Sequence, residues 1–304
     1  MESWERIAKW MMTTHPDDLF ERSGRLGGSR LSQAECAWRV LNIIPLRLMQ
    51  LPSGGVDYKT FQSATAFLMY QWDASHVVGL SLYNVLIASY NEAFILLKSF
   101  LELLLNGVLF QGLAEKRFRE TPSPSLKPTD SLSMLFKELS NSIEQGDIDA
   151  LELESNSVAI FDHIRRDWIL SAFGLQMRET IRQVADWGML NGVANDPVKT
   201  VGDLYGSLSL DMHAGVQQTN LGRAVGEGAK IFECPAPILS SSLFEFLEGF
   251  HSVMETAVIT ELNLLSGLVD RDRVVETCRG LLQTDDFQLA NLKQATRVIE
   301  GLIA

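Results

Sequence analysis

The sequence predicts an all-α fold, a multi-helix bundle with long apolar central helices. Three observations lead to this fold class. Apolar residues recur at helical spacing along most of the chain, whereas the strict alternation typical of strands is nearly absent. Hydrophobic residues make up 46% of the 304 residues, which supplies a large core. Prolines and glycines gather in a few short segments, as expected where short connections join helices.

The first part of the chain, residues 1–56, is expected to form N-terminal helices. We expect a short amphipathic helix over 2–13 and a loop over 14–30, where two adjacent glycines interrupt the pattern. A second helix is expected over 32–50, with a kink at Pro45 inside it. A Pro-Ser-Gly-Gly sequence then ends this helix.

A helical bundle is expected over residues 57–304. Its main block, 57–119, contains either two long helices or one helix broken near 73–76. Three prolines forbid helix within 121–130, which we interpret as a loop inside one bundle, although a linker between two domains is the alternative. The remaining expectations are helices at 131–145, 150–166, 167–190 and 199–213, an irregular glycine-rich segment at 214–237, and one long helix followed by two shorter ones over 238–303.

Charge and cysteine content narrow the function classes. Lys and Arg number 26 against 38 Asp and Glu, which gives a net charge of −12. RNA remains a possible partner, but the overall charge does not favour it, because phosphate binding needs a basic face. The three cysteines form no CxxC pair, and the first residues lack the apolar stretch of a signal peptide. These observations predict a cytoplasmic protein.

The most apolar region is expected to be a buried core helix and not a membrane span. The longest uncharged run, 74–91, contains His76 and two asparagines, and the sequence beyond it carries Glu92, Lys98 and Glu102. Charges at the centre of a bilayer are costly. We therefore expect no membrane contact.

A metal site is one of the chemical alternatives. Glu248 and His251 form an ExxH pair with Glu255 one turn further on, which is half of the motif of a di-iron bundle. A second ExxH is missing. We expect no cofactor, and a metal-binding helical bundle is kept as an alternative.

Two polar stripes form the candidate site. Along one predicted helix, Lys98 and Glu102 are four residues apart and can pair directly. They share a stripe of about 80° with three asparagines, at positions 84, 91 and 106. Further on, Tyr205, Ser209 and His213 recur every four residues along one side of a short helix. We expect Glu102 to pair with His213 or Ser209 in a buried seam; the alternative is two unrelated features.

These residues resemble motifs of HEPN-like prokaryotic helical proteins over about 57–115 and 199–215. The sequence AFILLKSFLE, which ends at Glu102, is similar to a core helix of that family. The pattern Tyr205-x3-Ser209-x3-His213 is similar to a Tyr, Ser and His motif that follows further along the chain in members of the family. The resemblance implies a dimeric helical bundle, since family members usually dimerise, and many are metal-independent ribonucleases of toxin or phage-defence systems while others are binding modules.

The chain departs from the active HEPN pattern in one respect. Active members carry an Arg, then four to six further residues, then a His on one helix, and none of the five histidines here has an Arg at that spacing. This favours a non-catalytic protein that acts through protein–protein interaction, and the resemblance implies that it is a homodimer. The alternative is a metal-independent ribonuclease whose site comprises His213, Ser209, Tyr205, Lys98 and Glu102.

Overall fold

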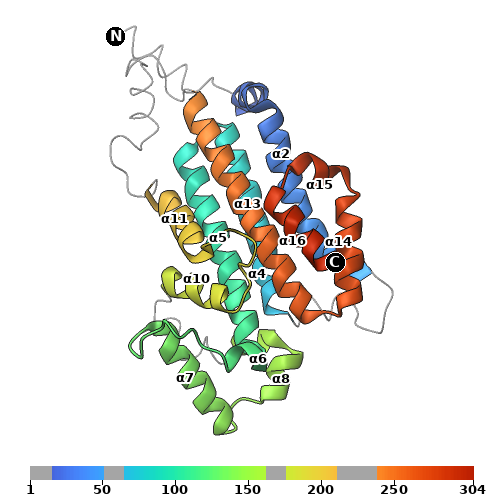
Figure 1. The fold of residues 1–304 in the computed structure, drawn as a ribbon. Coiled ribbons are helices and arrows are strands. Elements are labelled where there is room, and N and C mark those ends of the chain that lie inside the picture. The colour runs from blue at the N-terminus through green and yellow to red at the C-terminus, as the bar shows by residue number, and fades with distance from the viewer. Residues whose placement is uncertain (1–15, 51–64, 162–175, 211–237) are drawn as a thin grey trace, which may run out of the picture.

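The computed structural model describes residues 16–50, 65–161, 176–210 and 238–304. These residues form helices and no strands, so the all-α prediction is confirmed (Figure 1). In chain order the helices are α2 (Pro16–Gln50), α4 (Ala66–Leu86), α5 (Tyr90–Ala114), α6 (Lys116–Arg119), α7 (Ser131–Glu144), α8 (Ala150–Ser155), the 3₁₀ helix η1 (Ser157–Ala159), α10 (Met177–Asp186), α11 (Pro197–Leu210), α13 (Ser240–Leu268), α14 (Arg271–Leu282), α15 (Asp285–Ala290) and α16 (Lys293–Ile303).

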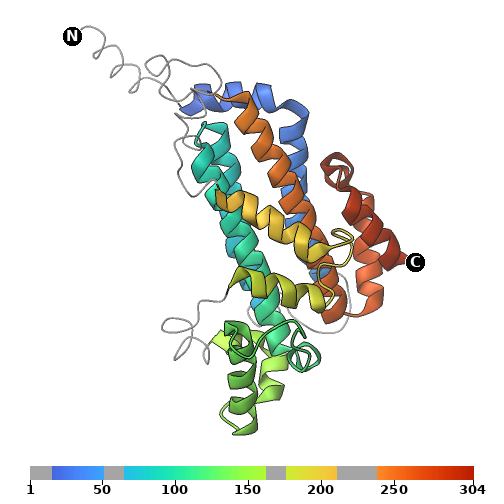
Figure 2. The ribbon, with the colours of Figure 1, turned by 60° about the vertical axis from the view of Figure 1, so that its left-hand side comes forward.

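Helix α5 lies at the centre of the bundle. It packs along α4 and against α13, and α10 and α11 cross it on another side (Figures 1 and 2). Of the described helices, α5 alone is long and apolar enough to cross a membrane by length and composition. Its most apolar window is nevertheless 61% buried inside the protein. Helix α5 therefore fits the prediction of a long apolar central helix.

Helices α4 and α5 form a tight hairpin. The sequence was compatible with two helices or with one helix broken near 73–76. The structure has two helices, and the break between them is at 87–89. Backbone hydrogen bonds close this turn, among them one from the Ser89 N–H to the Asn84 carbonyl at 2.8 Å. Ala88 has a φ of 61°, the left-handed conformation that often ends a helix. The apolar pattern runs through the turn, which is why periodicity alone did not locate it.

Helix α2 differs most from the sequence prediction. The loop expected over 14–30 is wrong, because the chain is helical from Pro16 onward. Gly28 adopts a φ of 47° and a ψ of −126°, which is not helical, so the expected interruption is present there as a kink between two helical arms. Figure 2 shows the first arm of α2 turning across the end of the bundle before the second arm runs along it.

The second arm of α2 belongs to the common core. Leu41 and Ile44 are fully buried in the same apolar cluster as the side chains of α5 and α13. Helix α2 also packs against α15 near the other end of the chain. The boundary expected at residue 56 and the helix expected over 2–13 lie outside the described residues.

The proline-rich segment 121–130 is non-helical and is anchored to α10. The Ser123 backbone N–H donates to Gln183 Oε1 at 2.7 Å. The Trp187 indole N–H donates to the Thr121 carbonyl at 3.0 Å. These hydrogen bonds hold the segment against α10 and the turn that follows it.

The later helices are shorter than expected. The helix predicted over 150–166 stops at Ser155 and is followed by η1. Three helices and not two follow α13, because Asp270 and Thr284 each accept a backbone N–H at a new helix N-terminus. The glycine-rich segment expected to be irregular, 214–237, lies outside the described part of the chain.

Candidate functional site

Helices α5 and α11 meet at a small polar cluster. Lys98 and Glu102 come from α5 and Tyr205 from α11; we call these three residues the Glu102 cluster. The Tyr205 hydroxyl donates to Glu102 Oε1 at 2.6 Å, and Lys98 Nζ lies 3.0 Å from the same oxygen. Lys98 Nζ also lies 4.9 Å from the centroid of the Tyr205 ring, within cation–π range. One carboxylate oxygen therefore ties α11 to α5.

The surroundings of the Glu102 cluster keep Lys98 charged and the Tyr205 hydroxyl neutral at neutral pH. The Lys98 side chain is 13% exposed and that of Glu102 is 32% exposed. Burial lowers the pKa of Lys98, but the hydrogen bonds to Glu102 and Tyr205 outweigh it and the pKa is raised. Burial and then the hydrogen bond to Glu102 raise the pKa of Tyr205. At neutral pH neither Lys98 nor Tyr205 is a base.

Ser209 does not reach Glu102 as expected. Its hydroxyl donates to the Tyr205 carbonyl one turn earlier, at 2.8 Å. Short hydroxyl side chains within helices commonly bond their own backbone in this way. The longer Tyr205 side chain takes the place on Glu102 that was expected for Ser209. His213, the other expected partner, lies outside the described residues.

The stripe of asparagines is divided between two helices. Asn84 lies on α4, where its side-chain amide donates to the Leu80 carbonyl at 2.8 Å. Asn91 and Asn106 stay on α5 with Lys98 and Glu102. Their Oδ1 atoms are buried and have no hydrogen-bond partner in the described structure. The turn at 87–89 thus removes one of the five polar residues from the stripe.

The ExxH pair on α13 does not converge on a common point. Glu248 Oε1 accepts from the Arg30 guanidinium at 3.1 Å, and Glu255 Oε1 accepts from the Gln294 backbone N–H. His251 Nδ1 is buried without a hydrogen-bond partner among the described residues. Within the described ranges, no three His, Cys, Asp or Glu side chains are grouped to hold a metal ion. This geometry lends the metal-binding alternative no support.

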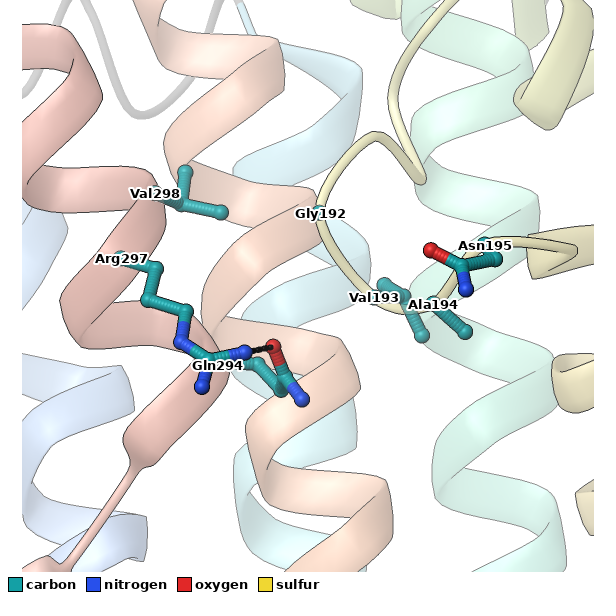
Figure 3. A pocket seen from close by; sticks show the side chains of 7 residues that line it. All are labelled: Gly192, Val193, Ala194, Asn195, Gln294, Arg297 and Val298. Carbon is teal, nitrogen blue, oxygen red and sulfur yellow. Dashed lines mark hydrogen bonds between the residues drawn. The ribbon is translucent and has the colours of Figure 1, made fainter.

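An open pocket of about 640 Å³ lies between the loop after α10 and helix α16 (Figure 3). Arg297 is the one charged residue of its lining, and its guanidinium donates to Gln294 Oε1 at 3.3 Å. The lining contains no carboxylate, histidine, serine or cysteine, so it offers no nucleophile or base. It comprises Gly192, Val193, Ala194, Asn195, Gln294, Arg297 and Val298.

Sequence reasoning missed a buried carboxyl group on α13. Glu261 is 0% exposed, and both of its side-chain oxygens lack a hydrogen-bond partner in the described structure. Burial raises the pKa of Glu261 well above its ordinary value. A signal was present in the sequence, because apolar residues occupy every position three or four residues away on the helix: Ala257, Val258, Leu264 and Leu265.

No protein-family model, curated protein or solved structure matches this chain. The resemblance to HEPN-like proteins therefore stays a prediction. What the site can do has to be judged from its own geometry. In the Glu102 cluster, the side chains that carry charge or an acidic proton are already paired with one another.

Proposed function

We propose that this protein acts through protein–protein contact and that the Glu102 cluster has a structural role. The observation that carries the proposal is an exposed apolar stripe on α4. Its largest member, Trp72, has 66% of its surface exposed. We call this stripe and the polar residues within it the α4 outer face: Met69, Trp72, Asp73, His76, Leu80 and Tyr83.

The other sides of α4 are held by the bundle. Towards α2, the Trp38 indole N–H donates to Ser75 Oγ at 3.2 Å, and Ser75 Oγ donates to Asn42 Oδ1 at 2.6 Å. Gly79 allows this close approach, because a Cβ there would lie 2.9 Å from the Trp38 ring. Towards α5, α4 packs along its length. These contacts fix the rotation of α4, so its outer face points away from the core.

An exposed face of this composition favours a binding role. Large aromatic side chains contribute most to binding energy where they become buried at an interface, and contiguous exposed apolar patches mark interaction sites. Tyr83 extends the stripe towards α2, where its ring centroid lies 6.5 Å from that of Phe20. Phe20 is itself 45% exposed. The apolar surface thus continues from one helix to the next.

The chemistry of the Glu102 cluster supports the same proposal. Glu102 Oε1 accepts from Tyr205 and lies against Lys98, so this carboxylate oxygen serves to join two helices. Ser209 donates to backbone, so no partner on Glu102 activates it as a nucleophile. The ribonuclease alternative then depends on His213, outside the described residues.

Photo-crosslinking in cells tests whether the α4 outer face contacts protein. We replace Trp72 by the photo-reactive amino acid benzoylphenylalanine and irradiate the cells. Because the side chain at this position points outward, we expect a covalent adduct larger than the single chain. Leu151 on α8 is the matched control, since it is 76% exposed but has no large exposed apolar side chain within four residues. We expect no adduct there.

Absence of an adduct at Trp72, or equal adducts at Trp72 and Leu151, would contradict the proposed function. Mass spectrometry of the adduct identifies the second protein. A crosslink within one chain counts against the proposal too, because the face would then be covered by another segment of the same molecule. Adducts specific to Trp72 support the proposal whichever protein is attached.

A further inference from the structure

Five of the six residues of the α4 outer face, all except Asp73, are arranged symmetrically about His76. Met69 and Tyr83 lie seven residues on either side of it, and Trp72 and Leu80 lie four residues on either side. All five occupy one side of the helix, within about 80° of arc at 100° per residue. A stripe with this spacing keeps its pattern when the helix direction is reversed.

We propose that the α4 outer face binds a second copy of this chain, with the two α4 helices antiparallel and His76 on the two-fold axis. This inference rests on the proposed function and names its partner. In this arrangement Met69 lies opposite the partner's Tyr83, and Trp72 lies opposite the partner's Leu80. Two-fold interfaces require such a self-complementary surface, since the same residues serve both copies. Each aromatic ring then covers an aliphatic side chain.

The charge distribution favours self-association through this face. Each copy carries a net charge of −12, so most approaches of two copies are repulsive. Helix α4 contains no Lys, Arg or Glu and one Asp, Asp73, in 21 residues. In the antiparallel register Asp73 lies opposite the partner's Gly79, so the two aspartates do not face each other. The α4 outer face is therefore a place where two acidic copies can meet with little repulsion.

The size of the face predicts a weak and reversible dimer. With two-thirds of Trp72 and about half of each of the other apolar side chains exposed, Phe20 included, roughly 500 Å² is available per copy. Stable dimers commonly bury about 800 Å² per partner or more. We therefore expect dissociation in the micromolar range, with dimer and monomer in rapid exchange.

Sedimentation of the full chain over a range of concentrations tests the dimer. We expect the weight-average mass to rise from one chain towards two, and Trp72→Glu to weaken association by at least about tenfold. Leu151→Glu, at a more exposed apolar residue, is the control and should associate as the wild type does. Circular dichroism and thermal unfolding verify that both variants are folded. A monomer at all concentrations, or a dimer unaffected by Trp72→Glu, overturns the inference.

Cysteine crosslinking tests the register. Because His76 lies on the proposed axis, His76→Cys should form a disulfide-linked dimer on mild oxidation, whereas Leu151→Cys should not. Met69→Cys mixed with Tyr83→Cys should crosslink more efficiently than either variant alone. A dimer without the His76→Cys crosslink overturns the antiparallel arrangement.

The crosslinked product at Trp72 separates the two proposals. If benzoylphenylalanine at this position attaches only to other proteins, the inference of a second copy fails and the proposed function stands. If no adduct forms and the protein is monomeric, both fail. Attachment to a second copy of this chain supports both.

Discussion

Two glutamates on the long central helices have opposite environments. Glu102 on α5 is half-buried and shares one oxygen with Tyr205 and Lys98. Glu261 on α13 is fully buried, and neither oxygen has a hydrogen-bond partner in the described structure. Glu102 lies at the edge of the core, where water and a cation reach it, whereas Glu261 lies among apolar side chains. The two residues show that a buried carboxyl group stabilises the fold only when it has hydrogen-bond or ionic partners.

The comparison separates two effects on stability. A paired carboxylate stabilises through its partners, although much of that energy offsets the loss of hydration. An unpaired buried carboxyl group is protonated in the folded protein, and burying it without hydrogen bonds costs free energy. Glu102 should therefore contribute to the free energy of unfolding, and Glu261 should reduce it.

The largest expected effect is at Glu261. We expect Glu261→Leu to raise the free energy of unfolding by about 2 kcal/mol at neutral pH, since an apolar side chain of similar size removes the unpaired polar group. Urea denaturation measures the change. Glu276→Leu on the exposed side of α14 is the control and should change stability by less than about 0.5 kcal/mol.

The pH dependence sharpens this prediction. The folded protein holds a proton on Glu261 that the unfolded chain releases above the ordinary pKa of 4.5. The contribution of Glu261 to the free energy of unfolding is most favourable below pH 4.5. It becomes less favourable as the pH rises towards the raised pKa of the folded state. The gain from Glu261→Leu should therefore grow between pH 4.5 and 7.5. A gain that does not change with pH would contradict the protonated state.

A smaller effect of opposite sign is expected at Glu102. Glu102→Ala leaves the Lys98 ammonium and the Tyr205 hydroxyl without their shared acceptor, so we expect a loss of about 1–2 kcal/mol. Glu138→Ala on the exposed side of α7 is the matched control and should be neutral. If Glu102→Ala is equally neutral in thermal and urea unfolding, the cluster contributes nothing to the fold and its structural role is wrong.

The smallest effect is expected at Tyr205. Tyr205→Phe keeps the ring over Lys98 and removes one hydrogen bond, which should cost about 1 kcal/mol. The pKa of Tyr205 is raised above its ordinary value of 10.0, so this contribution is present below pH 10 and is lost as the pH rises through the folded-state pKa. Unfolding curves at neutral pH and above pH 10 should show the difference shrinking. If the difference in unfolding free energy between the wild type and Tyr205→Phe does not change with pH, the Tyr205 hydroxyl does not make the hydrogen bond to Glu102.

The sequence predicted the components of the Glu102 cluster better than their connections. Helical spacing correctly grouped Lys98 with Glu102, and Tyr205 with Ser209, on single helix faces. The contacts between α5 and α11 depend on how the two helices cross and on the lengths of their side chains. The periodicity of the sequence predicts neither. Tyr205 reaches across the gap, whereas the short Ser209 hydroxyl bonds to its own backbone.

The fold class followed from periodicity, but several boundaries did not. Residues 14–30 were expected to form a loop; the interruption at Gly28 is present, but from Pro16 onward the chain on both sides of it is helical. The turn before α5 was missed, because Ala88 adopts its left-handed conformation without a Gly or Asn to mark it. The burial of Glu261 could have been predicted from the sequence, because the residues three and four positions away on the helix are all apolar. A single charged residue among them was the signal.

The three-residue connection between α4 and α5 bears on the order in which the chain assembles. Closing a short loop costs little entropy, and proteins fold faster when their contacts are close in sequence. The ion pair between Arg39 and Asp286 joins positions 247 residues apart. We expect the α4–α5 hairpin to serve as the nucleus around which the other helices condense. The seam between α2 and α15 should close last, so the two ends of the chain meet only after its middle has formed.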